Sequence, residues 1–139
     1  MKNSNSHVIV ALDVGERRIG VAHADTHVSF PVAHGDIEVV ELEIERLREV
    51  ITEFDPALIV LGYPRNQHGE TTAQTRYVEA FAEKLEVLSI PLAFQDESLT
   101  SVLAEQYLKS QKKPYTKGDI DAHAAAIILG DYLETHFSQ

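Results

Sequence analysis

Apolar strand-like stretches alternate with amphipathic helix-like stretches along most of the chain, and this alternation constrains the fold more than any other feature. It is typical of an α/β domain, in which helices cover the faces of a sheet. The chain has 139 residues and no internal repeat, which predicts one domain of ordinary size. We expect a flexible, polar tail over residues 1–6 and a single folded domain over residues 7–137.

Three strand-like segments open the chain. Val8–Val14 is apolar and rich in branched residues, which predicts a buried strand. Arg18–Asp25 follows after a short turn, and so short a connection favours an antiparallel pair. Apolar side chains alternate in residues 28–33, which predicts a third strand. Pro31 places that strand at a sheet edge, because proline cannot donate to a ladder.

Helical and strand-like segments then alternate in the order αβαβαα. We expect the helices at residues 38–54, around Tyr77 and Phe81, around a buried stripe with Leu103 and Tyr107, and from about Asp119 onward. The strands lie between them, at residues 57–61 and 91–95. Because crossovers between parallel strands are right-handed, this order predicts a mixed five-stranded sheet flanked by helices, with the second strand antiparallel.

Three acidic residues lie where such a fold would bring them together. Asp13 is at the end of the first strand, Glu97 is just past the end of the fifth, and Asp121 is in the first turn of the last helix. The carboxyl ends of parallel strands share one edge of a sheet. Converging carboxylates repel one another unless they hold a cation. Oxygen ligands suit Mg²⁺ or Mn²⁺, and two such ions about 3.5–4 Å apart serve phosphodiester hydrolysis.

Each of these acids also suits a purely structural role. An aspartate at a strand end is common in turns, which would account for Asp13. A glutamate before a helix favours the helix dipole, which would account for Glu97. Asp119 and Asp121 both suit a helix cap, and we assign the cap to Asp119 and the site to Asp121.

The net charge of −10 argues against a generic nucleic-acid coat protein, which should be basic. The bases are unevenly spread, and the fold would bring several of them to the carboxylate edge. The candidate phosphate contacts are Arg17, Arg18, Arg65, Lys112, Lys113 and Lys117. The lysine-rich stretch also suits a solvated loop, and Arg18 also suits a structural role in its strand. Tyr115 within that stretch is a candidate stacking platform.

Four segments in order resemble the YqgF/RuvX family, which is described as Holliday junction resolvases and as pre-16S rRNA nucleases. The similarity runs from about Val8 to Leu133. Residues 13–22 are similar to the family's first hairpin, and residues 81–85 continue its pattern. The other matches are Gly62-Tyr63-Pro64 with Gly69 to a G-x-P loop, Asp96-Glu97-Ser98-Leu99-Thr100-Ser101 to D-E-R-L-T-T, and Lys117-Gly118-Asp119-Ile120-Asp121-Ala122-His123-Ala124-Ala125 to K-G-x-x-D-x-x-A-A.

The resemblance implies a ribonuclease-H-like fold with sheet order 3-2-1-4-5. It also implies that Asp13, Glu97 and Asp121 bind metal, in agreement with the argument from strand ends. Its substrate would be the 5′ end of precursor 16S rRNA. One residue departs from the pattern: Ser98 stands where the family has arginine. Either the phosphate contact is weaker and activity is reduced, or another base replaces the arginine.

We therefore expect a metal-dependent nuclease with a nucleic-acid partner, precursor rRNA or ribosomal precursor particles. The alternatives are a resolvase of four-way DNA junctions and a catalytically weak RNA-binding domain. The absence of cysteine fits a reducing, cytoplasmic setting. No apolar run approaches the roughly 20 residues of a membrane span, so we expect no membrane partner. Either a monomer or a weak homodimer is compatible with the sequence.

Overall fold

The computed structural model describes residues 7–28, 30–38, 43–97 and 100–137. The strands are β1 (Val8–Val14), β2 (Arg18–Asp25), β3 (Val32–Glu38), β4 (Leu58–Pro64) and β5 (Leu92–Glu97). The helices are α1 (Glu43–Phe54), α2 (Ala73–Leu85), α3 (Thr100–Ser110) and α4 (Lys117–Phe137), with a 3₁₀ turn, η1 (Glu86–Leu88), after α2. Among the described helices, none is both long and apolar enough to cross a membrane.

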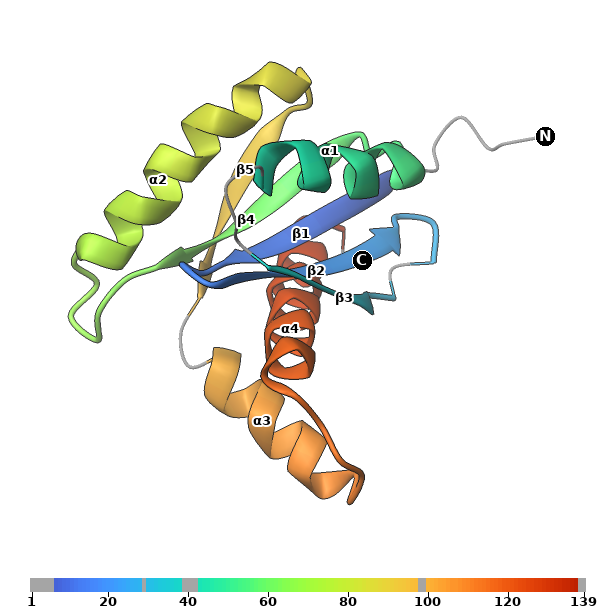
Figure 1. Ribbon diagram of the computed structural model, residues 1–139, viewed down its shortest axis with the longest axis vertical. Coiled ribbons are helices and arrows are strands. Elements are labelled where there is room, and N and C mark those ends of the chain that lie inside the picture. The colour runs from blue at the N-terminus through green and yellow to red at the C-terminus, as the bar shows by residue number, and fades with distance from the viewer. Residues whose placement is uncertain (1–6, 29, 39–42, 98–99, 138–139) are drawn as a thin grey trace.

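The five strands form one mixed sheet in the order β3-β2-β1-β4-β5 (Figure 1). β2 is antiparallel to both of its neighbours, whereas β1 pairs with β4, and β4 with β5, in parallel. The strand order and the antiparallel second strand confirm the prediction. β1 is therefore the central strand, and its carboxyl end lies at the same edge of the sheet as those of β4 and β5.

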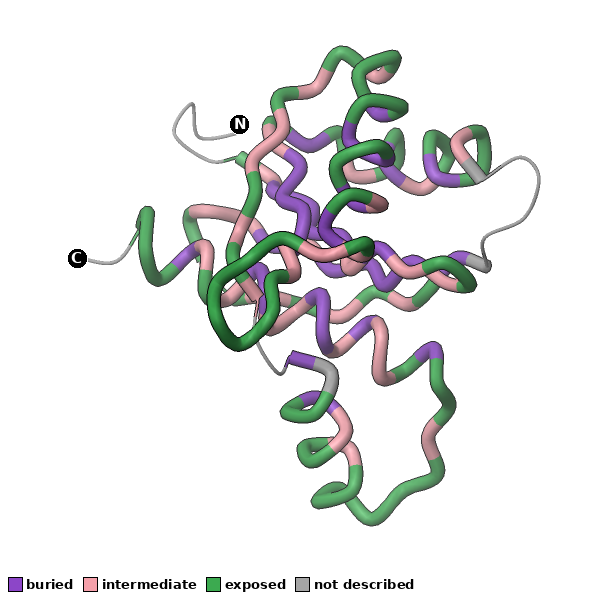
Figure 2. Tube along the Cα trace, turned by 90° about the vertical axis from the view of Figure 1, so that its left-hand side faces the viewer, coloured by how far each residue is buried: buried purple, intermediate pink, exposed green. Residues whose placement is uncertain are grey.

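Helices cover the two faces of the sheet unequally. Because successive side chains of a strand point to opposite faces, Val10 and Leu12 of β1 join a core under α1 and α2, whereas Ile9 and Ala11 join a core under α4. Figure 1 shows α1 and α2 over one face and α4 over the other, and Figure 2 shows the buried residues concentrated along the sheet between them. The same alternation directs Asp13 to the α4 face.

The start of α2 is tied to the carboxyl edge of the sheet. Thr72 caps the helix in a reciprocal capping box with Thr75, which satisfies two backbone N–H groups. The Gln74 side-chain amide donates to the Val14 carbonyl at 3.0 Å, and the Thr75 hydroxyl donates to the Pro64 carbonyl. These bonds tie the start of α2 to the ends of β1 and β4, at the edge that carries the acids.

The third strand differs from the prediction. β3 runs over Val32–Glu38 instead of residues 28–33, and Val28 and Phe30 are 68% and 67% exposed. β3 pairs with β2 in antiparallel orientation, with a register shift between Val21 and Ala22 of β2. Ile37 of β3 is buried in the core. Pairing with β2 thus outweighs the apolar alternation that favoured the earlier segment. Pro31 lies just before this edge strand.

Three helix predictions also need correction. Glu38 ends β3, so the first helix does not begin there, and residues 39–42 lie outside the described part of the chain. Leu103 and Tyr107 of α3 are 48% and 50% exposed instead of buried, because α3 extends beyond the sheet and packs against α4 (Figure 1). α4 begins at Lys117 rather than near Asp119.

Candidate active site

Asp13 lies on the central strand, one residue before β1 ends, and its partner on β2 is Gly20. Burial, followed by the negative charges of Glu97 and Asp121, raises the pKa of Asp13 from 3.8 to about 7. A neighbouring charge shifts a pKa strongly only at short range. Asp13 and Glu97 lie at the carboxyl edge of the sheet, and the backbone of Asp121 packs on Gly20, the partner of Asp13, so the three acids lie near one another although they come from distant parts of the chain.

Glu97 ends β5, the strand at the opposite edge from β3. Burial raises the pKa of Glu97, and a hydrogen bond from the Thr100 hydroxyl partly offsets this rise. That hydroxyl lies 3.0 Å from Oε2 of Glu97, and Thr100 is itself buried at the first turn of α3. The bond fixes the orientation of the carboxylate and stabilises its charged form.

Gly62 makes room for the Glu97 carboxylate. A Cβ at this position of β4 would lie 2.9 Å from Oε2 of Glu97 and 2.6 Å from Cδ1 of Ile128. Any side chain here would push the carboxylate or α4 away from the sheet. The glycine of the segment similar to a G-x-P loop is therefore required for steric reasons, which the sequence alone did not reveal.

Asp121 takes no part in the capping box of its helix, which Thr116 and Asp119 form. The backbone N–H of Thr116 donates to Oδ2 of Asp119 at 2.9 Å, and the N–H of Asp119 donates to the Thr116 hydroxyl at 3.1 Å. This reciprocal pair is a capping box. Asp119 takes part in the cap as predicted, but Thr116 is the N-cap residue and Asp119 is the third residue of the helix. Gly20 lets α4 approach β2, since a Cβ there would lie 2.0 Å from the Asp121 carbonyl oxygen.

Arg18, at the start of β2, forms an ion pair with Asp121. Its Nε donates to Oδ2 of Asp121 at 2.6 Å, and both side chains are half-buried. Within the part of the chain that the structure describes, no three acidic, histidine or cysteine side chains are grouped as a ready-made metal site. Asp121 would therefore have to leave Arg18 to share a cation with the other two acids.

The donor set nevertheless fits a hard divalent cation. It consists of carboxylate oxygens from three residues. Burial raises the pKa of two of these residues, Asp13 and Glu97. A bound cation would relieve the mutual repulsion of the acids and would displace protons from them. These three side chains remain the candidate ligands, although they are not grouped as a metal site in the described part of the chain.

The remaining predicted phosphate contacts fall into two groups. Lys117 lines a cleft together with Arg18 and Asp121, whereas Arg17 is exposed in the β1–β2 turn. Arg65 is exposed after β4, forms an ion pair with Asp96 and lies over the Tyr63 ring. All four are near strand or helix ends that meet at the carboxylate edge.

Lys112 and Lys113 lie farther from the acids than expected. They follow α3, whose 11 residues begin beside Glu97, and a helix of that length spans about 16 Å. Figure 1 shows the α3–α4 connection at the far end of α3, away from the sheet. These lysines therefore do not border the carboxylate edge. Ser98, which stands where the family has arginine, lies outside the described residues.

Sequence reasoning missed the residues that support the acids. Thr100 orients Glu97, and Gly20 and Gly62 provide the space in which two of the acids lie. Thr100 stands three residues after Glu97, in the segment similar to D-E-R-L-T-T, so its position was a usable indication. The close approaches at the two glycines depend on how α4 packs, which no local pattern reveals.

The sheet order, the flanking helices and the acidic edge define a domain of the ribonuclease-H-like fold. In agreement, the structure of Thermus thermophilus RuvC in complex with a Holliday junction substrate superposes with a TM-score of 0.55. Its sequence is 15% identical, and the match covers 92% of this chain and 94% of that chain. A second Thermus thermophilus RuvC structure gives a TM-score of 0.53.

The chain belongs to the RuvX family, because the family model described as "RuvX: Holliday junction resolvase" matches residues 7–135. A relative from Chloroflexus aurantiacus, named "Putative pre-16S rRNA nuclease", is 40% identical, with 96% of this chain and 91% of the relative covered. One of the same name from Chlorobium chlorochromatii is 38% identical, with 91% and 94% covered. The chain is thus a nuclease, a hydrolase of phosphodiester bonds whose partner is nucleic acid.

Proposed function

We propose that this chain trims the 5′ end of precursor 16S rRNA during ribosome biogenesis, with Asp13, Glu97 and Asp121 holding Mg²⁺ or Mn²⁺. The observation that carries the proposal is the placement of the three acids around the end of β1. Asp13 pairs with Gly20, which packs against the backbone of Asp121. On the neighbouring strand β4, Gly62 lies against the Glu97 carboxylate. The substrate comes from the names of relatives that match the chain almost end to end.

Each acid has a defined part in the proposed reaction. Asp13 supplies a ligand from the central strand, and Glu97 supplies a second one in the orientation that Thr100 sets. Asp121 supplies the third when it turns from Arg18. A bound pair of divalent ions would activate the attacking water and stabilise charge on the leaving 3′ oxygen.

The bases position the nucleic acid. Arg18, once released from Asp121, can donate to a phosphate oxygen beside the carboxylates, and Lys117 stands next to it. Arg17 and Arg65 extend this positive border along the edge, and Lys112 and Lys113 would contact a more distant part of the strand. Such phosphate contacts fix the register of the substrate without reading its sequence.

This substrate implies work on ribosomal precursor particles in the cytoplasm, by a monomer or a weak homodimer. A second candidate substrate is a four-way DNA junction, which the family model's own description favours. Resolution of such a junction calls for two sites presented symmetrically, as in a two-fold dimer. A catalytically weak RNA-binding domain is the third reading.

The deciding experiment compares three substrates under the same conditions with Mg²⁺ and with Mn²⁺. They are precursor rRNA 5′ ends, generic single-stranded RNA and four-way DNA junctions. The proposal predicts that the precursor end is cleaved fastest. Preferred cleavage of the junction would select the second candidate, and binding without cleavage would select the third.

Three variants test the ligand set directly. Asp13→Asn, Glu97→Gln and Asp121→Asn should each abolish cleavage while the protein stays folded. Glu49→Gln, which alters an exposed carboxylate on α1, is the matched control and should retain full activity. Retained cleavage in any of the three would remove that residue from the ligand set.

A further inference from the structure

We propose that the cleft between α3 and the start of α4 is a nucleotide subsite, which takes one unpaired base of a single-stranded substrate next to the scissile phosphate. The inference rests on the proposed nuclease function and adds to it the class of substrate. The cleft has a volume of about 470 Å³, within the range of roughly 300–1,000 Å³ that is usual for small-ligand pockets. Its lining residues are Arg18, Val102, Glu105, Tyr115, Thr116, Lys117, Ile120 and Asp121.

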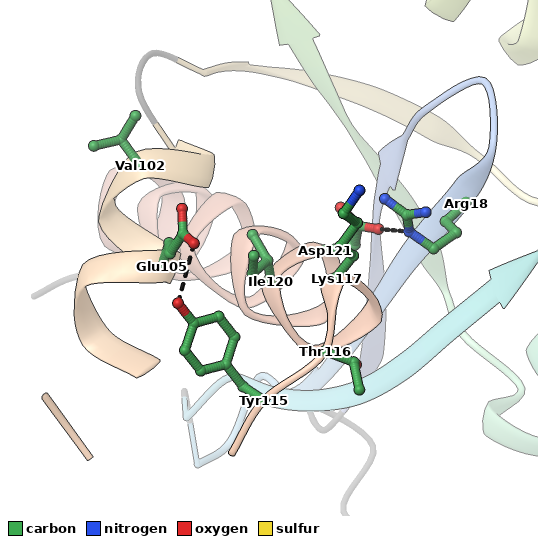
Figure 3. A pocket seen from close by; sticks show the side chains of 8 residues that line it. All are labelled: Arg18, Val102, Glu105, Tyr115, Thr116, Lys117, Ile120 and Asp121. Carbon is green, nitrogen blue, oxygen red and sulfur yellow. Dashed lines mark hydrogen bonds and ion pairs between the residues drawn. The ribbon is translucent and has the colours of Figure 1, made fainter. Parts of the chain in front are cut away.

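The two ends of the cleft differ in chemistry. Figure 3 shows Tyr115 and Glu105 on one side and the Arg18–Asp121 pair on the other, with Ile120 between them. The first end offers an aromatic ring and apolar surface, and the second offers a guanidinium beside a proposed metal ligand. A nucleotide has the same polarity, because its base is flat and largely apolar and its phosphate is anionic.

The Tyr115 ring is held in place. Its hydroxyl donates a hydrogen bond to Oε2 of Glu105 at 3.0 Å, across the gap between the α3–α4 connection and α3. A ring fixed in this way loses little freedom when a base stacks on it, and stacking on aromatic side chains is a general means of binding single strands. The base would lie between this ring and the phosphate that Arg18 and Lys117 attract.

Only an unpaired base fits this arrangement. Two helices bound the cleft, so a base inside a duplex cannot reach Tyr115 without leaving its stack and its partner. The cleft therefore favours a single-stranded substrate, such as an unpaired RNA end, over the paired arms of a junction.

Glu105 gives the subsite a preference among bases. Its carboxylate still has acceptor capacity beyond the tyrosine bond and can accept from an exocyclic amino group. Adenine, cytosine and guanine carry such a group. Uracil has no amino group, and its N3–H donor lies between two carbonyl oxygens, which a carboxylate repels. We expect amino-bearing bases to bind more tightly than uracil.

The test uses a short single-stranded RNA in which 2-aminopurine replaces one base, titrated with protein in EDTA so that no cleavage occurs. Stacking on Tyr115 should quench the fluorescence, and annealing the RNA to its complement should prevent the quenching. Tyr115→Leu should weaken binding roughly 5- to 150-fold, as expected for the loss of one stacked base. Tyr107→Leu is the matched control, because it removes an exposed tyrosine of α3 that does not line the cleft.

Several results would overturn the subsite. They are the absence of quenching, equal quenching by the duplex, unchanged binding by Tyr115→Leu, or an equal loss in the Tyr107→Leu control. Glu105→Gln should level the preference against uracil, and an unaltered preference would refute the role of Glu105. The binding assay in EDTA is independent of the cleavage assay, so the two proposals can fail separately. Stacking in the first without hydrolysis in the second would contradict the proposed function alone. Hydrolysis without stacking would contradict the subsite alone.

Discussion

Replacing Asp13 with asparagine should stabilise the metal-free protein at pH 8 while it abolishes cleavage. Asparagine has nearly the same size as aspartate but no charge. The structure places the wild-type carboxylate where burial, and then Glu97 and Asp121, raise its pKa to about 7 from 3.8. The wild-type protein therefore carries an ionised, unfavourably placed carboxylate at pH 8, and the variant does not.

The magnitude follows from the difference between the two pKa values. The folded state binds the Asp13 proton more tightly than the unfolded state does, so this stabilising contribution is fully present below pH 3.8. It is lost as the pH rises through about 7. At 1.36 kcal/mol for each pKa unit, the loss amounts to about 4 kcal/mol. The free-energy advantage of Asp13→Asn should thus be near zero at pH 4 and largest at pH 8.

The assay is urea unfolding in EDTA at several pH values between 4 and 8. The measured quantity is the difference in unfolding free energy between the variant and the wild type, so that titration of carboxylates remote from Asp13 cancels. Glu49→Gln, which alters an exposed carboxylate on α1, provides the control. A difference for Asp13→Asn that is flat across this range, or that favours the wild type at pH 8, would refute the reasoning.

The supporting residues give further predictions. Thr100→Val removes the hydroxyl that donates to Glu97 and should lower the cleavage rate about 10- to 100-fold, whereas Thr100→Ser keeps the donor and should not. Equal steady-state rates for the two variants would contradict the role of Thr100. Gly62→Ala should cost about 1–3 kcal/mol in urea unfolding because its methyl group has no room. Gly130→Ala, whose Cβ would lie at an ordinary 3.6 Å from the nearest side chain, should instead stabilise α4 by about 0.5–1 kcal/mol. A Gly62→Ala variant more stable than Gly130→Ala would show that Gly62 is not required for space. Changing Lys112 and Lys113 together to alanine should weaken RNA binding and reduce the slope of log K against log salt by about 1.4 if both contact phosphate; an unchanged slope would place the RNA elsewhere.

The chain order of strands and helices was predictable because each β-strand or helix carries its own periodicity. β1 and β2 have the bounds that were expected. Short connections and right-handed crossovers predicted the mixed sheet, and the family resemblance implied its strand order. β3 could not be found in this way. Its residues are mostly small or polar, and what holds them is pairing with β2 across a register shift.

The candidate site was predictable in its acids but not in their surroundings. Strand ends and a helix start made Asp13, Glu97 and Asp121 candidates, and the family resemblance implied the same three; their role as metal ligands stays a prediction. The ion pair of Arg18 with Asp121 depends on how closely α4 packs on β2, which Gly20 permits. The exposed stripe of α3 was misjudged because apolar spacing cannot show that a helix extends past the sheet.

The central claim is that three distant carboxylates hold divalent cations together. Anomalous scattering from a crystal soaked in Mn²⁺ measures this directly. The account predicts peaks within coordination distance of Asp13, Glu97 and Asp121, with Asp121 turned away from Arg18. Peaks at other side chains, or beside one acid with the Arg18–Asp121 pair intact, would contradict it.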